Sequence, residues 1–195
     1  MNFEFESNFE SVKTVAISLA SWAEADSVED HDSKWHEFGV LGHIEKVIDN
    51  ARRIKEFTGI DIIKVAVWHD IGKFIVRKEK KDKQGSFNFK GHEEASAVYL
   101  QNNSDFSEEE LFLVANHGVI RGKSTVEEII TLCRDDKQLI AKLILLCAAD
   151  TSGKGFPPAQ KVQRHELAPK FAQLVQEAGL GEDLIILVHD IVLSW

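Results

Sequence analysis

The chain has 195 residues, 44% of them hydrophobic, which suits a single folded domain with a substantial core. Its formal net charge of -9 argues against broad binding to nucleic acids, because phosphate backbones are bound by an excess of Lys and Arg. A small phosphorylated ligand remains compatible with this charge. The acidic N-terminus shows no secretory signal, and the longest apolar run, residues 139–149, is too short to span a bilayer.

Apolar residues recur at intervals of three and four along nearly the whole chain, which predicts an all-α protein of seven or eight helices. The first helix is expected over residues 9–24. The next begins near Gly42 and carries His43 at its entrance, beside an apolar stripe. A third helix should run from about residue 61 and end at Gly72, where glycine would take the left-handed conformation that closes helices.

The lysine-rich segment 76–91 predicts an exposed loop, which could instead act as a lid or attract an anionic substrate. Helix resumes at residue 92, and capping boxes at Ser107 and Thr125 predict two more helix starts. A buried helix is expected over residues 136–150, followed by helices over 158–178 and 182–195. The sequence shows no internal repeat and no sign of a second domain, so we expect residues 1–195 to form one helical domain.

Three histidines precede an aspartate, at His31, His69 and His189, so this dipeptide alone is weak evidence for a site. His31 lies in the charged stretch EDHDSKWHEF, residues 29–38, which predicts a solvated loop. His189 lies in an apolar stretch, which predicts a hydrogen-bonded core residue. His69 differs because it ends the apolar part of VAVWHDIGKF, residues 65–74, and has other histidines at helix ends before and after it.

Six nitrogen and carboxylate donors fall at predicted helix starts or ends: His43, His69, Asp70, His92, His117 and Asp150. Imidazole with carboxylate suits Mn, Fe, Co, Ni or Zn, and the lack of paired cysteines argues against a structural thiolate zinc site. A helical domain could gather these ends in one cleft. The two cysteines, Cys133 and Cys147, lie among apolar residues and favour a reduced, cytoplasmic protein.

The order of these donors along the chain resembles the pattern of the HD-domain superfamily of metal-dependent phosphohydrolases. Local matches are HDIGK at residues 69–73, GHEEAS at 91–96 and LLCAADTSGKG at 145–155. The similarity covers about residues 36–155, with helical extensions at 1–35 and 156–195. The resemblance implies a core set of metal ligands, and two further ligands in members that bind two ions, here His92 and His117. The core set is His43, His69, Asp70 and Asp150.

The resemblance implies hydrolysis of a nucleotide or another small phosphate ester, a monoester or a diester, by a metal-bound hydroxide. Two divalent ions are expected, drawn from Mn, Fe, Ni, Co, Zn and Mg, with Asp70 bridging them. Lys73 would act in catalysis and on substrate phosphate, and Arg121 and Lys123 could also reach the phosphate. Alternatively, Lys73 is a helix-end cation and the other two lie in an ordinary exposed loop. Cyclic dinucleotides are disfavoured, because no Gly-Tyr-Pro segment follows GHEEAS.

Other interpretations stay open at this point. Glu93 and Glu94 either orient His92 or are ordinary acids of a first helical turn. Phe87 and Phe89 are expected to pack, although either could meet a nucleobase. The chain could also be a non-catalytic HD module that binds a nucleotide or a protein, or a di-iron oxygenase. No membrane or extended nucleic-acid partner is expected, and the apolar segment 183–195 could form a dimer seam, although a core helix is the simpler interpretation.

Overall fold

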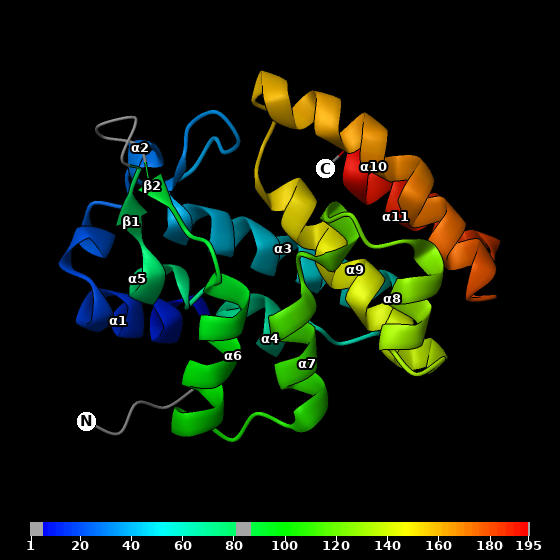
Figure 1. The fold of residues 1–195 in the computed structure, drawn as a ribbon, viewed down its shortest axis with the longest axis horizontal. Coiled ribbons are helices and arrows are strands. Elements are labelled where there is room, and N and C mark those ends of the chain that lie inside the picture. Colours follow the sequence, from blue (N-terminus) through cyan, green and yellow to red (C-terminus); the bar gives the residue numbers. More distant parts are fainter. Residues whose placement is uncertain (1–5, 81–86, 195) are drawn as a thin grey trace.

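The computed structural model describes residues 6–80 and 87–194, and these form a helical fold, as the sequence predicts (Figure 1). Residues 81–86 of the expected loop and residue 195 of the expected last helix lie outside these ranges. Two antiparallel strands of two residues each form the only sheet in the described part of the chain. In chain order the elements are α1 (Phe9–Leu19), η1 (Ser21–Glu24), α2 (Val28–His31), α3 (Val40–Thr58), α4 (Ile63–Trp68), α5 (Lys73–Val76), β1 (Lys78–Glu79), β2 (Phe87–Asn88), α6 (His92–Asn103), α7 (Glu108–Asn116), η2 (Val119–Arg121), α8 (Val126–Leu132), α9 (Lys137–Gly153), α10 (Pro158–Glu177) and α11 (Glu182–Ser194).

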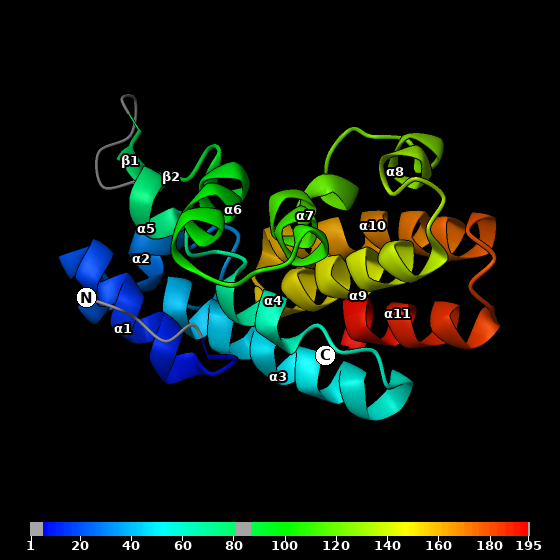
Figure 2. The same cartoon turned by 90° about the horizontal axis from the view of Figure 1, so that it is seen from below.

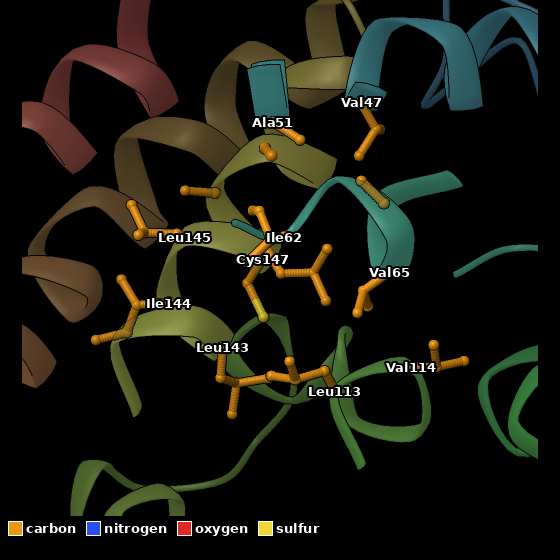
Figure 3. Packing of buried hydrophobic residues seen from close by; sticks show 14 of the residues in the cluster. Val47, Ala51, Ile62, Val65, Leu113, Val114, Leu143, Ile144, Leu145 and Cys147 are labelled. Carbon is orange, nitrogen blue, oxygen red and sulfur yellow. The ribbon is translucent and has the colours of Figure 1, made fainter. Parts of the chain in front are cut away.

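Helix α9 lies at the centre of the molecule and packs against α3, α7, α10 and α11 (Figures 1 and 2). It is buried on nearly all sides from Ile140 to Gly153, which is typical of a helix enclosed by other helices. Figure 3 shows part of this core, in which Leu143 and Cys147 of α9 belong to one buried cluster with Val47 and Ala51 of α3 and Leu113 of α7. The expected buried helix is therefore confirmed, with its C-terminal end close to α3.

The N-terminal and C-terminal elements lie on opposite sides of this core. Elements α1, α2 and the hairpin gather at one end of the molecule, and α10 with α11 form an antiparallel pair at the other (Figures 1 and 2). Both capping boxes form as predicted, at Ser107 before α7 and at Thr125 before α8. None of the described helices is long and apolar enough to cross a bilayer.

Three local expectations were wrong. The helix expected over residues 9–24 is broken by extended backbone at Ala20, because the chain there turns into η1. The segment 76–91 is not one loop, since α5 ends at its first residue and the strands β1 and β2 form within it. The stretch 29–38 is not a solvated loop either: α2 ends in it, and His31 is only 1% exposed.

Both cysteines are buried and free, which agrees with their expected place in the core. Burial raises the pKa of the Cys147 thiol to about 12, so this side chain behaves as a small apolar group. His189 departs from expectation: it is exposed on α11, because Val188, Ile191 and Val192 form the buried face of that helix. One face of α11 packs on α9 and α10, so this helix borders the core and is not enclosed by it.

Candidate metal centre

His69 and Asp70 lie in a turn between two helices that are both fixed by the core. Helix α4 ends at Trp68, which is fully buried, and α5 begins at Lys73. Adjacent residues on a continuous helix point about a hundred degrees apart. The turn therefore provides the change of direction that lets both side chains face one site, and it ends α4 a few residues before the predicted position.

Gly72 is needed in this turn for space and not for a left-handed conformation. Its φ of -63° lies in the ordinary helical region, contrary to the expectation. A Cβ at this position would come within 2.2 Å of the His92 carbonyl oxygen and 2.5 Å of the Ser96 nitrogen. The Gly72 N–H donates to Ser96 Oγ at 2.8 Å. The missing side chain thus lets the start of α6 approach the turn, which brings His92 close to Asp70.

One group of donors gathers around the Oδ2 atom of Asp70. His43 Nε2 from α3 lies 3.3 Å from this oxygen and 3.1 Å from Asp150 Oδ1 at the end of α9. His69 Nε2 lies 3.3 Å from the same Asp70 oxygen. His43, His69 and Asp150 place one donor atom each within 4.8 Å of one another, and all three side chains are buried.

A second group faces the other carboxylate oxygen of Asp70. His92 Nε2 lies 3.2 Å and His117 Nε2 lies 3.5 Å from Oδ1, and these two nitrogens are 3.3 Å apart. Glu93 joins this group, because its Oε2 lies 3.1 Å from His92 Nδ1, whereas Glu94 is exposed. Asp70 therefore stands between two groups of donors, with one oxygen toward each, and the groups adjoin because His69, Asp70 and His117 also place donor atoms within 4.8 Å of one another.

The backbone sets the orientation of three of the four histidine rings. The Nδ1 atoms of His69, His92 and His117 lie 2.7, 2.9 and 2.7 Å from the carbonyl oxygens of Ala66, Phe89 and Val114. An Nδ1–H that donates to a carbonyl leaves the Nε2 lone pair free, and here each Nε2 points at Asp70. This is the tautomer that binds metal ions through Nε2.

Several atoms at the centre of the cluster are buried without a hydrogen bond among the described residues. They are the Nε2 atoms of His43 and His69 and both carboxylate oxygens of Asp70. Leaving buried polar atoms unpaired costs about 1–3 kcal/mol each, so a native fold keeps such a cluster only for a purpose. Imidazole nitrogens and carboxylate oxygens at this spacing are the donor set of a divalent transition metal, and the residues present fit one.

The charges in the cluster also favour a cation. Burial alone would raise the pKa of Asp70, but Lys73 and His69 outweigh it and hold that pKa well below its usual range. Asp150 behaves alike, because Arg121 outweighs its burial and keeps its pKa low. Burial opposes protonation of His69, yet the charges of Asp70 and Asp150 raise its pKa above the ordinary value. Both carboxylates are thus ionised at neutral pH in a buried place.

The cluster opens into a cavity of about 440 Å³ between the hairpin, the N-terminal elements and the end of α9. Among the predicted phosphate-binding residues, Lys73 and Arg121 line this cavity, whereas Lys123 is exposed and does not. Lys73 Nζ lies 2.6 Å from Asp70 Oδ2, and Arg121 contacts Asp150 Oδ2. Phe87 and Phe89 line the cavity as well.

The cavity residues that could not be predicted from the sequence include His31, His36 and Lys154. His31 Nε2 accepts from Lys73 Nζ at 2.7 Å, while its Nδ1–H donates to the Phe38 carbonyl at 3.1 Å. Its ring stacks on His36 with 3.6 Å between the centroids. Charged neighbours in the sequence suggested solvent, and no local pattern reveals that α2 folds back over the cavity.

The model of the HD domain family matches residues 40–152, which is more than half of the chain. The matched segment contains all six donors, from His43 to Asp150. It also agrees with the span of about 36–155 over which the resemblance is seen in the sequence. No curated protein and no solved structure gives a significant match to this chain.

Proposed function

The chain belongs to the HD-domain family of metal-dependent phosphohydrolases, and on this premise we propose that it hydrolyses a nucleotide or another small phosphate ester with the help of two divalent metal ions. The two oxygens of Asp70 carry this proposal, because each faces a different pair of imidazole nitrogens at 3.2–3.5 Å. A carboxylate in this position suits a bridge between two ions.

The donors divide into two sets around that bridge. His43, His69 and Asp150 would hold one ion with Asp70, and His92 and His117 would hold the other. Bound ions would lower the pKa of a water molecule and screen the charge on phosphoryl oxygens. Their identity among Mn, Fe, Co, Ni, Zn and Mg depends on availability and geometry as much as on these donors.

The neighbouring cations would place the phosphate at this centre. Lys73 is 6% exposed and is held between Asp70 and the neutral ring of His31, so its N–H groups have a fixed direction. Arg121 is fixed by Asp150 and keeps other N–H groups for a phosphoryl oxygen. In the reaction a water oxygen forms a bond to phosphorus, the ester P–O bond breaks, and a proton passes to the leaving alkoxide.

The first test is metal content per chain, by elemental analysis of protein purified without chelator or affinity metal. We expect two ions in the parent, one after His117→Ala and few after Asp70→Ala, with His165→Ala as a control because His165 is exposed on α10. If the parent binds one ion and His117→Ala also binds one, the proposed second metal site does not exist.

The metal-loaded protein would then be given phosphomonoesters, phosphodiesters and nucleoside triphosphates. Turnover that is lost in Asp70→Ala would support the hydrolase. Full metal occupancy without turnover on any of these substrates would contradict the hydrolase and favour a binding module. No bound ion even after metal addition would contradict both the metal centre and the enzyme.

A further inference from the structure

Most cations at the cavity already have a carboxylate partner. Lys73 pairs with Asp70 at 2.6 Å, Arg121 pairs with Asp150, and Lys80 pairs with Asp32 at 3.1 Å. Lys154 lines the same cavity and forms no ion pair among the residues that the structure describes. It follows Asp150 by four residues, at the end of α9. One partly buried positive charge beside the metal centre therefore lacks an internal counter-charge.

The backbone around Lys154 is held in place from two sides. Its carbonyl accepts from the Glu37 N–H at 3.0 Å, which joins it to the segment before α3. The guanidinium of Arg164, on α10, donates to the carbonyls of Ser152 and Gly155 at 2.6 and 2.7 Å. These contacts fix the turn on both sides of Lys154, so the side chain starts from a rigid base.

In the absence of a bound anion, the surroundings of Lys154 disfavour its charged ammonium form. Burial and the nearby Arg121 guanidinium lower the pKa of the Lys154 ammonium to about 7. Asp150 and Asp70 act in the opposite sense but do not cancel this effect. A phosphate group bound at the Asp70 and Asp150 end of the cavity would supply the missing negative charge.

We propose that Lys154 binds a non-bridging phosphate oxygen of the substrate and that this substrate is a phosphomonoester. The inference rests on the proposed function and narrows it. A monoester carries three non-bridging oxygens and close to two negative charges at neutral pH, because its second pKa is about 6. A diester has only two such oxygens and one charge. Three cations, Lys73, Arg121 and Lys154, around one end of the cavity match the monoester.

Binding of inorganic phosphate to the metal-loaded protein tests this assignment without any turnover. By titration calorimetry we expect Lys154→Met to weaken phosphate binding at least tenfold, and Lys154→Arg to stay within about threefold of the parent. Lys161→Met, an exposed lysine on α10, should change nothing. Elemental analysis should show the same metal content in all four proteins, which separates loss of the anion from loss of the ions.

Activity adds a second readout on two esters with one leaving group, p-nitrophenyl phosphate and bis(p-nitrophenyl) phosphate. The parent should prefer the monoester, and Lys154→Met should lower kcat/KM at least tenfold on the monoester but less than threefold on the diester. Equal phosphate affinity in Lys154→Met and the parent would overturn the role of Lys154. A preference of the parent for the diester would overturn the monoester assignment. If no ester is hydrolysed, the proposed hydrolase fails, while the phosphate titration still decides whether Lys154 binds the anion.

Discussion

Arg164 and Asp70 are both charged, both 1% exposed, and differ completely in how the fold treats them. The guanidinium of Arg164 donates to four backbone carbonyls, those of Thr151, Ser152, Gly155 and Val192, at 2.6–3.3 Å. The two oxygens of Asp70 make no hydrogen bond among the described residues, although four imidazoles and Lys73 surround them.

The difference distinguishes a buried charge that stabilises the fold from one that we propose binds a ligand. Arg164 ties the turn after α9 to α10 and α11, because its two terminal nitrogens donate to backbone carbonyls inside the protein. It also stacks on Phe156 at 4.1 Å. Asp70 is charge-paired with Lys73, but the Nε2 atoms of His43 and His69 beside it have no hydrogen bond among the described residues. Removing each residue should therefore affect different properties, stability for Arg164 and ligand binding for Asp70.

The largest expected effect on folding comes from Arg164→Met. Four carbonyls would lose a charged donor inside the protein, and we expect the free energy of unfolding to fall by about 3–5 kcal/mol. Urea denaturation of the metal-free protein measures this loss. Lys161→Met, on the exposed side of the same helix, should stay within about 0.5 kcal/mol of the parent. A loss below about 1 kcal/mol for Arg164→Met would show that the turn after α9 holds without it.

Metal addition should stabilise the parent and leave Asp70→Ala unchanged. An ion that binds only the native state adds about 2.7 kcal/mol at a free concentration one hundred times its Kd. The removal of Asp70 takes an oxygen from both donor sets, so this gain should vanish. Thermal unfolding with and without a chelator measures it. His165→Gln should keep the full gain, and an equal metal effect in Asp70→Ala would contradict the idea that Asp70 joins the two sets.

His31, a third buried polar side chain, is expected to affect the pH dependence of stability. Burial and the charge of Lys73 hold the pKa of His31 well below its ordinary value of 6.5. The neutral ring therefore contributes stability above pH 6.5 that is lost as the pH falls, by up to about 1.4 kcal/mol per pH unit. His69 has a raised pKa and contributes in the opposite sense, but it is present in both proteins.

His31→Gln should flatten this slope below about pH 6.5 in the metal-free protein, measured by urea denaturation at several pH values. His165→Gln should leave the slope as it is, because His165 is exposed. An unchanged slope in His31→Gln would contradict a lowered pKa for His31 and a neutral ring that accepts from Lys73.

The elements whose causes are local in the chain could be predicted well. The capping boxes at Ser107 and Thr125 form as expected, and the apolar stripe of α3 packs into the core. The order of the six donors indicated the family, and the structure brings all six together around Asp70. Their role as metal ligands stays a prediction. Spacing was informative here because each donor lies at a helix end, and helix ends meet in a helical cluster.

What depends on distant contacts could not be predicted. Gly72 has a steric reason that involves His92 and Ser96 on another helix. His31 is buried because the chain after η1 folds over the cavity, where Asp26 Oδ1 accepts from the Leu41 N–H at 2.6 Å. His189 is exposed because its neighbours fill the contact with α9 and α10, although its apolar surroundings in the sequence indicated the core.

The sequence by itself determined that this chain is helical, where most of its helices begin, and which six side chains are candidates to bind metal. Helical periodicity and capping act within a few residues, so they can be recognised without the fold. Only the tertiary structure decided that Asp70 faces two donor sets, that His31 supports Lys73, and that Lys154 has no carboxylate partner among the described residues. Those properties depend on which charges meet across the cavity, and that is set by the packing of helices far apart in the chain.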